Sequence, residues 1–316
     1  MRIAAKISKI GMSAFLNMLS YTLVETRRLD KSEAAQSGYT NSEFWILTPE
    51  FCILSPMLID YHTHTRLTDG TKEPVDYARV AVERGLDELG CSDHAPLADR
   101  ETNWTLKRAD LSTYVGWVRE AQKQFPKLSI KLGLEVDFIP GSENWVRELA
   151  AMHPWDYFLG SVHFIGDWPV DMSAEKWKDR DIEATWREYF DLWKQAARSR
   201  LFDSLAHPDL PKKFNFRPKT DFTGVFEDAL RVVAESGVAI ELSTAGLRKP
   251  CREMYPSEQF LRIAQRFDIP ITLGSDAHLP EDVGASFDKA VLLAHACGYN
   301  KICRFTQRKC ELVPLG

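Results

Sequence analysis

The 316-residue sequence lacks any apolar run that approaches the ~20 residues of a membrane-spanning helix, and this rules out an integral membrane protein. It also lacks a basic excess, because 40 Lys and Arg stand against 45 Asp and Glu and give a formal net charge of −5. General nucleic-acid binders usually carry a basic face, so this balance disfavours that class. The sequence also shows no internal repeat and no low-complexity tract, which argues against repeat architectures.

Cysteine is scarce and scattered. The six cysteines form no C-x-x-C pair and no finger-like spacing, which speaks against a disulfide scaffold or a structural zinc motif. A hydrophobic fraction of 44% and a charged fraction of 27% are ordinary for a globular chain. We therefore expect a reduced, soluble, cytoplasmic protein with neither nucleic acid nor a membrane as its partner.

The first 56 residues differ from the rest of the chain. Residues 3–24 are mildly apolar, carry basic side chains and contain no acidic residue. Such a composition is compatible with a targeting peptide, but no clear apolar core region and cleavage site accompany it. We therefore expect residues 1–56 to be a poorly ordered extension and residues 57–316 to form the folded domain, starting at Met57.

From Met57 onward, short apolar runs alternate with longer segments of helical spacing. The predicted strands are Leu58–Tyr61, Leu86–Cys91, Ile130–Val136, Tyr157–Val162, Ser204–Ala206, Val238–Leu242 and Ile271–Gly274. The predicted helices are residues 74–85, 111–125, 143–152, 174–199, 222–236, 257–267 and 284–297. Seven successive strand–helix units favour an α/β fold with a parallel sheet closed into a barrel, although the pattern alone does not exclude an open, doubly wound sheet.

Nearly every predicted strand ends in a residue that can bind a metal ion. These segments are Asp60-Tyr-His62-Thr-His64, Ser92-Asp93-His94, Gly133-Leu-Glu135-Val-Asp137, Ser161-Val-His163, Ala206-His207-Pro208-Asp209 and Gly274-Ser-Asp276-Ala-His278. They contain six of the eight histidines in the chain. Parallel barrels place their active sites at the carboxyl ends of the strands, so these side chains should meet in one cavity. The positions favour a barrel and predict a metal cluster.

The spacing within these segments suits metal binding. Residues two apart in an extended strand point to the same side, so His62 with His64, and Asp276 with His278, can each present two donors to one cavity. Neutral imidazole and carboxylate oxygen suit Zn²⁺, Mn²⁺ or Fe²⁺. A carboxylate such as Glu135 can bridge two cations, and two metals about 3.5–4 Å apart activate a bridging water for attack on phosphorus.

Each segment taken alone has a structural explanation. An H-x-H pair is common, Ser-Asp often caps a helix, and a single His before Pro can satisfy a buried carbonyl. Glu135 could be a core carboxylate paired with an arginine. Coincidence explains six of seven strand ends poorly, so we favour the metal site. His153 and His295 fall in helical segments outside the pattern, and Cys91 is expected to pack in the barrel.

The six strand-end segments resemble, in order, the motifs of the polymerase-and-histidinol-phosphatase (PHP) superfamily. Four segments are further similar to the monofunctional histidinol-phosphate phosphatases within it: Gly133–Asp137, Gly160–Phe164, Ser243–Pro250 with Met254–Ser257, and Gly274–His278. The resemblance covers roughly residues 57–315. It implies a distorted seven-stranded (β/α)7 TIM-like barrel of the PHP type with a site for two to three divalent metal ions, Zn, Mn or Fe.

The resemblance also implies how the ligands are divided among three sites. The ligands of the first would be His62, His64, Glu135 and Asp276. Those of the second would be Glu135, His163 and His207. Those of the third would be His94, His278 and a residue from the loop after the first strand. The family usually has His or Asp six positions after the second His of H-x-H, where this chain has Gly70, so we expect Asp69 to take that place.

The implied activity is hydrolysis of L-histidinol phosphate to L-histidinol and phosphate, a phosphomonoester hydrolysis in histidine biosynthesis. A metal-bridging hydroxide would attack phosphorus in line. Asp209 is a candidate proton donor to the leaving group. Arg248 is the first candidate for binding the phosphate, because its planar fork matches phosphate oxygens, and Lys212 and Lys249 are further candidates. The alternative for all three cations is a solvated basic surface.

Three other functions stay open at this point. The site could serve a PHP-type phosphoesterase that acts on another small phosphate ester or a nucleotide. The acidic balance and the Ser243–Lys249 segment favour a small substrate over a nucleic-acid strand. The chain could also be a metal-binding module without catalysis, although nearly every expected ligand is present. A metal-dependent amidohydrolase fits a Glu135 bridge less well. The oligomeric state is open.

Overall fold

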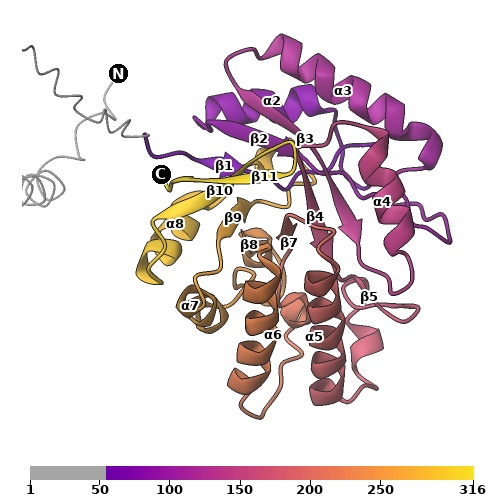
Figure 1. The fold of residues 1–316 in the computed structure, drawn as a ribbon, viewed down its shortest axis with the longest axis vertical. Helices are drawn as coiled ribbons and strands as arrows, with labels where there is room; N and C mark the ends of the chain where they lie inside the picture. The colour runs from indigo at the N-terminus through magenta and orange to yellow at the C-terminus, as the bar shows by residue number, and fades with distance from the viewer. Residues whose placement is uncertain (1–54) are drawn as a thin grey trace, which may run out of the picture. The chain divides into compact units, whose positions relative to one another are not determined.

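Seven short parallel strands form the central sheet of the fold, which the computed structural model describes for residues 55–316 (Figure 1). In their order in the sheet they are β1 (Ile59–Asp60), β2 (Glu88–Cys91), β3 (Ser129–Asp137), β4 (Tyr157–Ser161), β7 (Ser204–Leu205), β8 (Ala239–Ser243) and β9 (Ile271–Gly274). The sheet closes between its first and last strands, because the Tyr61 amide donates to the Leu273 carbonyl at 3.1 Å. The predicted seven-stranded barrel is therefore confirmed over an open sheet. The predicted extension, residues 1–56, lies outside the described residues except for its last two.

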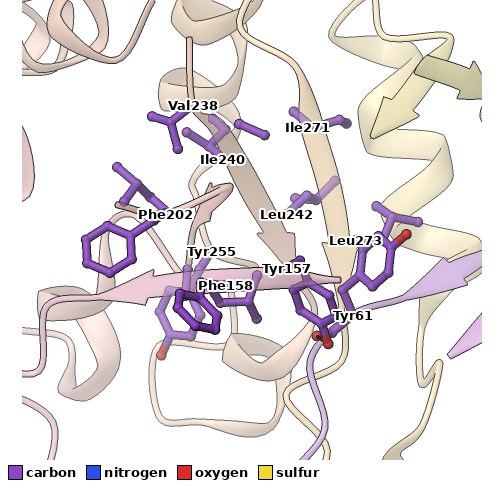
Figure 2. Close-up of a cluster of buried hydrophobic side chains, with 14 of the residues drawn as sticks. Tyr61, Tyr157, Phe158, Phe202, Val238, Ile240, Leu242, Tyr255, Ile271 and Leu273 are labelled. Carbon is purple, nitrogen blue, oxygen red and sulfur yellow. Dashed lines mark hydrogen bonds between the residues drawn. The ribbon is translucent and has the colours of Figure 1, made fainter. Parts of the chain in front are cut away.

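β8 shows why the strands appear as short apolar runs in the sequence. All five of its residues are buried. Ile240 and Leu242 pair in register with Ile271 and Leu273 of β9, and Figure 2 shows these four side chains together. Glu241 points to the other face of the strand, into the barrel. Helices cover the outer face of a parallel barrel and side chains fill its interior, so residues on both faces are shielded from water.

The helices between the strands are α2 (Pro74–Glu83), α3 (Leu111–Gln124), α4 (Glu143–Met152), α5 (Ile182–Ser199), α6 (Thr223–Ser236), α7 (Glu258–Arg266) and α8 (Phe287–Ala296). Each overlaps a predicted helix. The predicted helix at 174–199 is in fact divided into a short 3₁₀ turn, η2 (Glu175–Trp177), and α5. The Asp181 carboxylate accepts the Ala184 amide at 2.9 Å and so starts α5 after the turn. Among the described residues no helix has the length and apolarity needed to cross a membrane.

Two antiparallel hairpins were missed by the sequence prediction. β5 (Phe164–Ile165) and β6 (Trp168–Pro169) follow β4, and β10 (Lys301–Thr306) and β11 (Lys309–Pro314) end the chain. The second hairpin covers the amino-terminal end of the barrel. There the Phe305 ring stacks on Tyr157 with centroids 6.0 Å apart, and the Phe305 amide donates to the Tyr61 hydroxyl at 2.7 Å.

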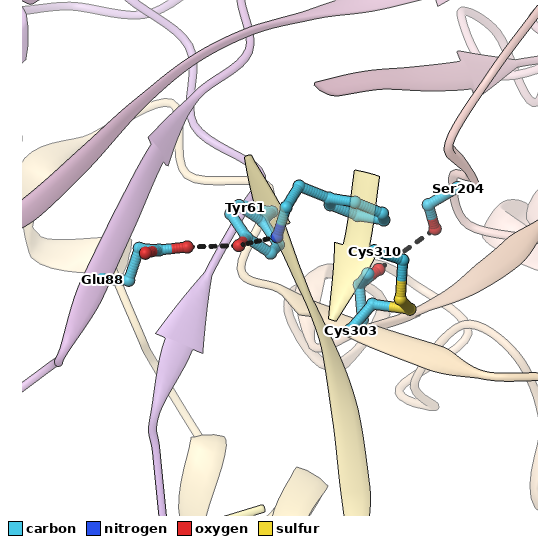
Figure 3. The surroundings of a disulfide bond; sticks show 7 residues. Tyr61, Glu88, Ser204, Cys303 and Cys310 are labelled. Carbon is cyan, nitrogen blue, oxygen red and sulfur yellow. Dashed lines mark hydrogen bonds between the residues drawn. A yellow bond between two sulfur atoms is a disulfide. The ribbon is translucent and has the colours of Figure 1, made fainter. Parts of the chain in front are cut away.

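The C-terminal hairpin also contains a disulfide, between Cys303 of β10 and Cys310 of β11 (Figure 3). The prediction of a fully reduced chain is wrong at this pair. The hairpin register brings the two Cα atoms to 5.4 Å, a separation that a bridge can span. A spacing of seven residues resembles no bridged motif, so the sequence alone did not reveal it. Cys91, Cys251 and Cys297 are buried free thiols, and Cys91 packs in the barrel as expected.

Candidate metal centre

The nine predicted ligands converge at the carboxyl ends of the barrel strands. They fall into four overlapping groups, and within each group the donor atoms lie within 4.8 Å of one another. The groups are His62–His64–Asp276, His62–Glu135–His207, His94–Glu135–His163 and His64–Asp69–His94–His278. The members come from the segments after β1, β2, β4, β7 and β9, with Glu135 from β3. The closed sheet thus brings together residues that are more than 200 positions apart in the chain.

Glu135 lies at the middle of the cluster and is 1% exposed. One carboxylate oxygen, Oε1, is 2.9 Å from His207 Nε2 and accepts the Ser161 hydroxyl at 2.5 Å. The other, Oε2, is 3.0 Å from His94 Nδ1 and 3.2 Å from His62 Nε2. Burial alone would raise the pKa of this carboxyl, but the surrounding imidazoles, led by His62, hold it well below its usual range. An ionised carboxylate with histidines beside both oxygens has the arrangement of a bridging ligand.

Asp69 joins the group of His64, His94 and His278, and the turn around Gly70 explains why. Asp69 Oδ2 is 3.1 Å from His278 Nε2, and Oδ1 is 3.6 Å from His94 Nε2. The Gly70 amide donates to the Thr65 carbonyl at 3.0 Å. A Cβ at position 70 would lie 1.9 Å from the His64 carbonyl oxygen, so this turn accepts only glycine there. The preceding residue therefore supplies the side chain.

Two residues of the cluster have backbone conformations that L-amino acids rarely adopt. His207 has φ of 27° and Asp276 has φ of 50°. Such conformations cost about 1–3 kcal/mol each and persist only where the surroundings fix them. The His207 amide donates to Glu241 at 2.8 Å, and the Arg248 guanidinium donates to the Asp276 carbonyl at 3.1 Å. Both conformations are thus held by contacts to side chains beside the cluster.

Two buried carboxylates outside the predicted ligand set orient the histidines. Glu241 accepts from His62 Nδ1 at 2.7 Å, and Asp137 accepts from His163 Nδ1 at 2.9 Å. Each contact fixes the imidazole ring and leaves Nε2 toward the cluster. Although burial lowers the pKa of His163, Asp137 and Glu135 outweigh it and raise the value to about 9. The signal for Glu241 was present in the sequence, as the one acidic residue inside an otherwise apolar strand.

Asp60 and Asp93 stand in the predicted motifs but hold loops together. Asp60 accepts the Ser275 amide at 2.9 Å and the Ser275 hydroxyl at 2.6 Å, which ties the loop after β9 to β1. Asp93 accepts from the Thr65 amide and from the Thr68 hydroxyl at 2.9 Å, and burial raises its pKa to about 6. Both keep the ligand-bearing loops in place.

The donor set fits divalent metal ions. Within the described chain, both ring nitrogens of His64 are buried without a hydrogen-bond partner, and His62 Nε2 and His94 Nδ1 lie near Glu135 Oε2 without the geometry of a hydrogen bond. A buried polar atom left unpaired costs about 1–3 kcal/mol, and coordination would relieve it. Burial, with His94 and His278 nearby, lowers the pKa of His64 to about 3, so its ring is uncharged at neutral pH. Neutral imidazoles and carboxylates suit Zn²⁺, Mn²⁺ and Fe²⁺.

A cavity of about 260 Å³ opens over the cluster. Its walls include the side chains of Asp171, Lys213, Lys249 and Tyr255, together with seven of the predicted ligands. Of the four residues predicted to touch a substrate, Lys249 is the one that lines it. A cavity of this volume has room for a small ligand.

The other three predicted substrate contacts have different surroundings. Arg248 donates to the Ser275 carbonyl at 2.6 Å and lies 3.4 Å from Asp282. Lys212 and Asp209 are fully buried and pair with each other at 2.8 Å. Lys213, which the sequence analysis passed over, faces the cavity instead. Successive side chains of the short 3₁₀ helix η3 (Leu210–Phe214) point in different directions, so neighbouring lysines face different surroundings.

Comparison with known proteins agrees with this geometry. Residues 60–245 match the model of the PHP domain, and residues 257–287 match that of the PHP-associated region. A protein named probable histidinol-phosphatase from Deinococcus radiodurans is 40% identical over 239 residues, which cover 74% of this chain and 91% of that one. The histidinol-phosphatase of Lactococcus lactis is 25% identical over 80% of this chain and 96% of its own length.

A solved structure shows the same architecture. The histidinol phosphate phosphatase of Lactococcus lactis, in complex with Zn, L-histidinol and phosphate, superposes with a TM-score of 0.72 at 25% identity. The match covers 81% of this chain and 100% of the Lactococcus lactis chain. With its seven-stranded barrel, its strand-end cluster of histidines and carboxylates and these relatives, the chain belongs to the PHP family.

Proposed function

We propose that the protein is a metal-dependent histidinol-phosphate phosphatase, a phosphoric monoester hydrolase that converts L-histidinol phosphate and water to L-histidinol and phosphate. The observation that carries the proposal is the convergence of nine ligand-type residues beneath a cavity walled by Lys213 and Lys249. Relatives named histidinol-phosphatase, one of them 40% identical, support the same substrate. A cytoplasmic location stays a prediction.

The groups His62–His64–Asp276 and His64–Asp69–His94–His278 support a first and a third site. The second rests on Glu135 Oε1, which lies 2.9 Å from His207 Nε2 and 3.6 Å from His163 Nε2. We assign His62, His64, Glu135 and Asp276 to the first, and Glu135, His163 and His207 to the second. The third takes Asp69, His94 and His278, with the His64 ring against it. We propose two to three divalent ions, of Zn, Mn or Fe, held in this way. Bound metals would lower the pKa of a water molecule and neutralise charge on the phosphate oxygens.

The protein's own side chains complete the chemistry. Glu135 stays ionised between the histidines and would join neighbouring sites through its two carboxylate oxygens. Lys249 and Lys213 supply positive charge in the cavity wall, where a phosphate dianion needs it. Glu241 and Asp137 hold the rings of His62 and His163 in the orientation that the cluster requires.

The predicted roles of the remaining residues change in this proposal. We assign Arg248 to positioning the Asp276 strand end, since its guanidinium is occupied by the carbonyls of Ser275 and Asp276. We assign Asp209 and Lys212 to a buried ion pair that ties η3 to the segment before α7, because Asp209 also accepts the Ser257 amide at 2.8 Å. Neither role requires contact with the substrate.

The test is phosphate release from L-histidinol phosphate by protein loaded with Mn²⁺ or Zn²⁺, alongside p-nitrophenyl phosphate and nucleoside monophosphates. We expect a clear preference for L-histidinol phosphate that His163→Ala abolishes. His153→Ala, a change to a histidine outside the cluster, serves as the matched control and should retain activity. Hydrolysis of all the esters at similar rates would instead place the chain among PHP phosphoesterases with another substrate. Absence of turnover with metal bound would contradict the proposal.

A further inference from the structure

An acid and a base lie side by side in the wall of the cavity. Asp171 Oδ2 is 2.9 Å from Lys213 Nζ, and the two side chains are 19% and 17% exposed. Asp171 follows the β5–β6 hairpin, whereas Lys213 belongs to η3, some forty positions later in the chain. Neither is among the residues that form the candidate metal groups. The pair therefore stands beside the metal cluster without belonging to it.

The backbone fixes Asp171 next to the cluster. The Val170 amide donates to the carbonyl of His163 at 2.8 Å, so the residue before Asp171 is bonded to a predicted ligand. The Val170 carbonyl accepts the indole N–H of Trp177 at 2.7 Å, and Trp177 is fully buried and stacks on Phe216. This segment is therefore anchored, and the Asp171 carboxylate is held at one side of the cavity.

The charge of Asp171 is unexpected in a cavity for phosphate. Burial acts to raise the pKa of this carboxyl, but Lys213 and the imidazole of His163 lower it below its usual value. An anion at this position repels a phosphate dianion unless a cation lies between them. Lys213 is one such cation, and a positive group on the substrate would be a second.

We propose that Asp171 binds the ammonium group of an amino-alcohol phosphate while Lys213 turns to an oxygen of its phosphate, so that the pair selects substrates carrying both charges. This inference rests on the proposed function, because L-histidinol phosphate bears its ammonium on the carbon next to the ester CH₂. The ion pair of the protein then exchanges for two ion pairs with the substrate. Esters without an ammonium group leave Asp171 facing the phosphate, and they are disfavoured.

The competing explanation is that the Asp171–Lys213 ion pair only holds two loops together, which we call a latch. The latch predicts that loss of Asp171 lowers stability and reduces activity toward every substrate alike. The proposal predicts a loss confined to substrates with an ammonium group. Asp167 provides the matched control, because it lies in the turn of the hairpin that precedes Asp171, is 92% exposed and pairs with Arg100 outside the cavity.

The experiment compares L-histidinol phosphate with imidazolylpropyl phosphate, in which hydrogen replaces the amino group. The wild-type protein should favour the amino substrate by about 10- to 100-fold in kcat/KM, the range for a hydrogen bond to a charged group. Asp171→Asn should remove most of this preference, by raising KM for L-histidinol phosphate, and should not lower kcat/KM for the deamino analogue, because the phosphate of that analogue is no longer repelled. Asp171→Glu should restore part of the preference, and Asp167→Asn should not change it.

A binding measurement gives a readout without turnover. L-Histidinol, titrated calorimetrically into metal-loaded protein, should bind at least about 10-fold more weakly to Asp171→Asn than to the wild type. Equal turnover of both esters by the wild type would overturn the inference without any variant. An equal loss for both esters in Asp171→Asn, with a lower Tm, would overturn it in favour of the latch. Absence of L-histidinol phosphate hydrolysis by the wild type would instead contradict the proposed function.

Discussion

Buried glutamates at the two ends of the barrel have different surroundings. At the amino-terminal end Glu88 is fully buried, and its carboxylate accepts from Tyr61, from Ser129 at 2.7 Å and from Arg304 at 3.2 Å. At the carboxyl end Glu135 is equally buried among histidines, several of whose ring nitrogens have no hydrogen-bond partner in the described chain. A site that is complete within the protein stabilises the fold, whereas one with unpaired donors is prepared for a ligand.

The largest expected effect separates the two glutamates. Glu135→Gln should lower kcat/KM for L-histidinol phosphate by about 10³-fold or more, because the amide cannot bridge two cations. Glu88→Gln should lower the free energy of unfolding by about 1–3 kcal/mol, because the amide loses the charge that Lys131 and Arg304 face and places a donor among donors, and leave kcat nearly unchanged. Steady-state kinetics and urea unfolding of both variants measure this. A fall in the activity of Glu88→Gln at temperatures where this variant is folded would contradict a purely structural role for Glu88.

The orienting carboxylates should give a smaller effect. Glu241→Gln should weaken divalent metal binding by about 10- to 100-fold, since the ring of His62 loses the partner that fixes it. Asp203→Asn removes a carboxylate at the opposite end, where it pairs with Arg308, and should leave metal affinity unchanged. Competition with a chromogenic chelator measures both affinities. Equal affinities for wild type and Glu241→Gln would contradict this role.

The carboxyl end of the barrel should respond to pH through His163. In the metal-free protein the raised pKa of His163, about 9, means that this ring carries a proton at neutral pH. Metal binding must displace that proton, so the apparent affinity should rise as the pH increases from 6.5 toward 9. The free energy of unfolding of the metal-free protein should change in the opposite direction. The contribution from the raised pKa of His163 is fully present below pH 6.5, the ordinary pKa of histidine in an unfolded chain, and is lost as the pH rises through 9. Calorimetric titrations in buffers of different ionisation enthalpy count the released protons, and pH-independent affinity would contradict this.

The smallest effect on catalysis is expected at the amino-terminal end. Cys310→Ser removes the hairpin disulfide and should cost about 2 kcal/mol of stability, the loop-closure value for a bridge of this short span. The value of kcat should stay within experimental error, because the bridge and the metal cluster lie at opposite ends. Urea unfolding with and without a reducing agent measures the change. A matching loss of kcat would show that the two ends are coupled.

The sequence predicted the strand ends well because each couples a short apolar run to a polar ligand. His62 and Glu135 were identified in this way. The sequence prediction failed where contacts depend on the tertiary structure. Lys212 and Lys213 are adjacent in sequence, yet only the local turn determines which one reaches the cavity. The Cys303–Cys310 bridge depends on the register of a hairpin that periodicity did not reveal.

The central claim is that the carboxyl end of the barrel is a divalent metal site that hydrolyses a phosphate ester. Its most direct test is a titration of chelator-treated protein with Mn²⁺, in which bound metal per chain and phosphate release from L-histidinol phosphate are followed together. The account predicts that two to three ions bind and that activity rises with them, whereas Glu135→Gln binds fewer ions and stays inactive. Full activity in the chelated protein, or no metal bound to the wild type, would contradict it.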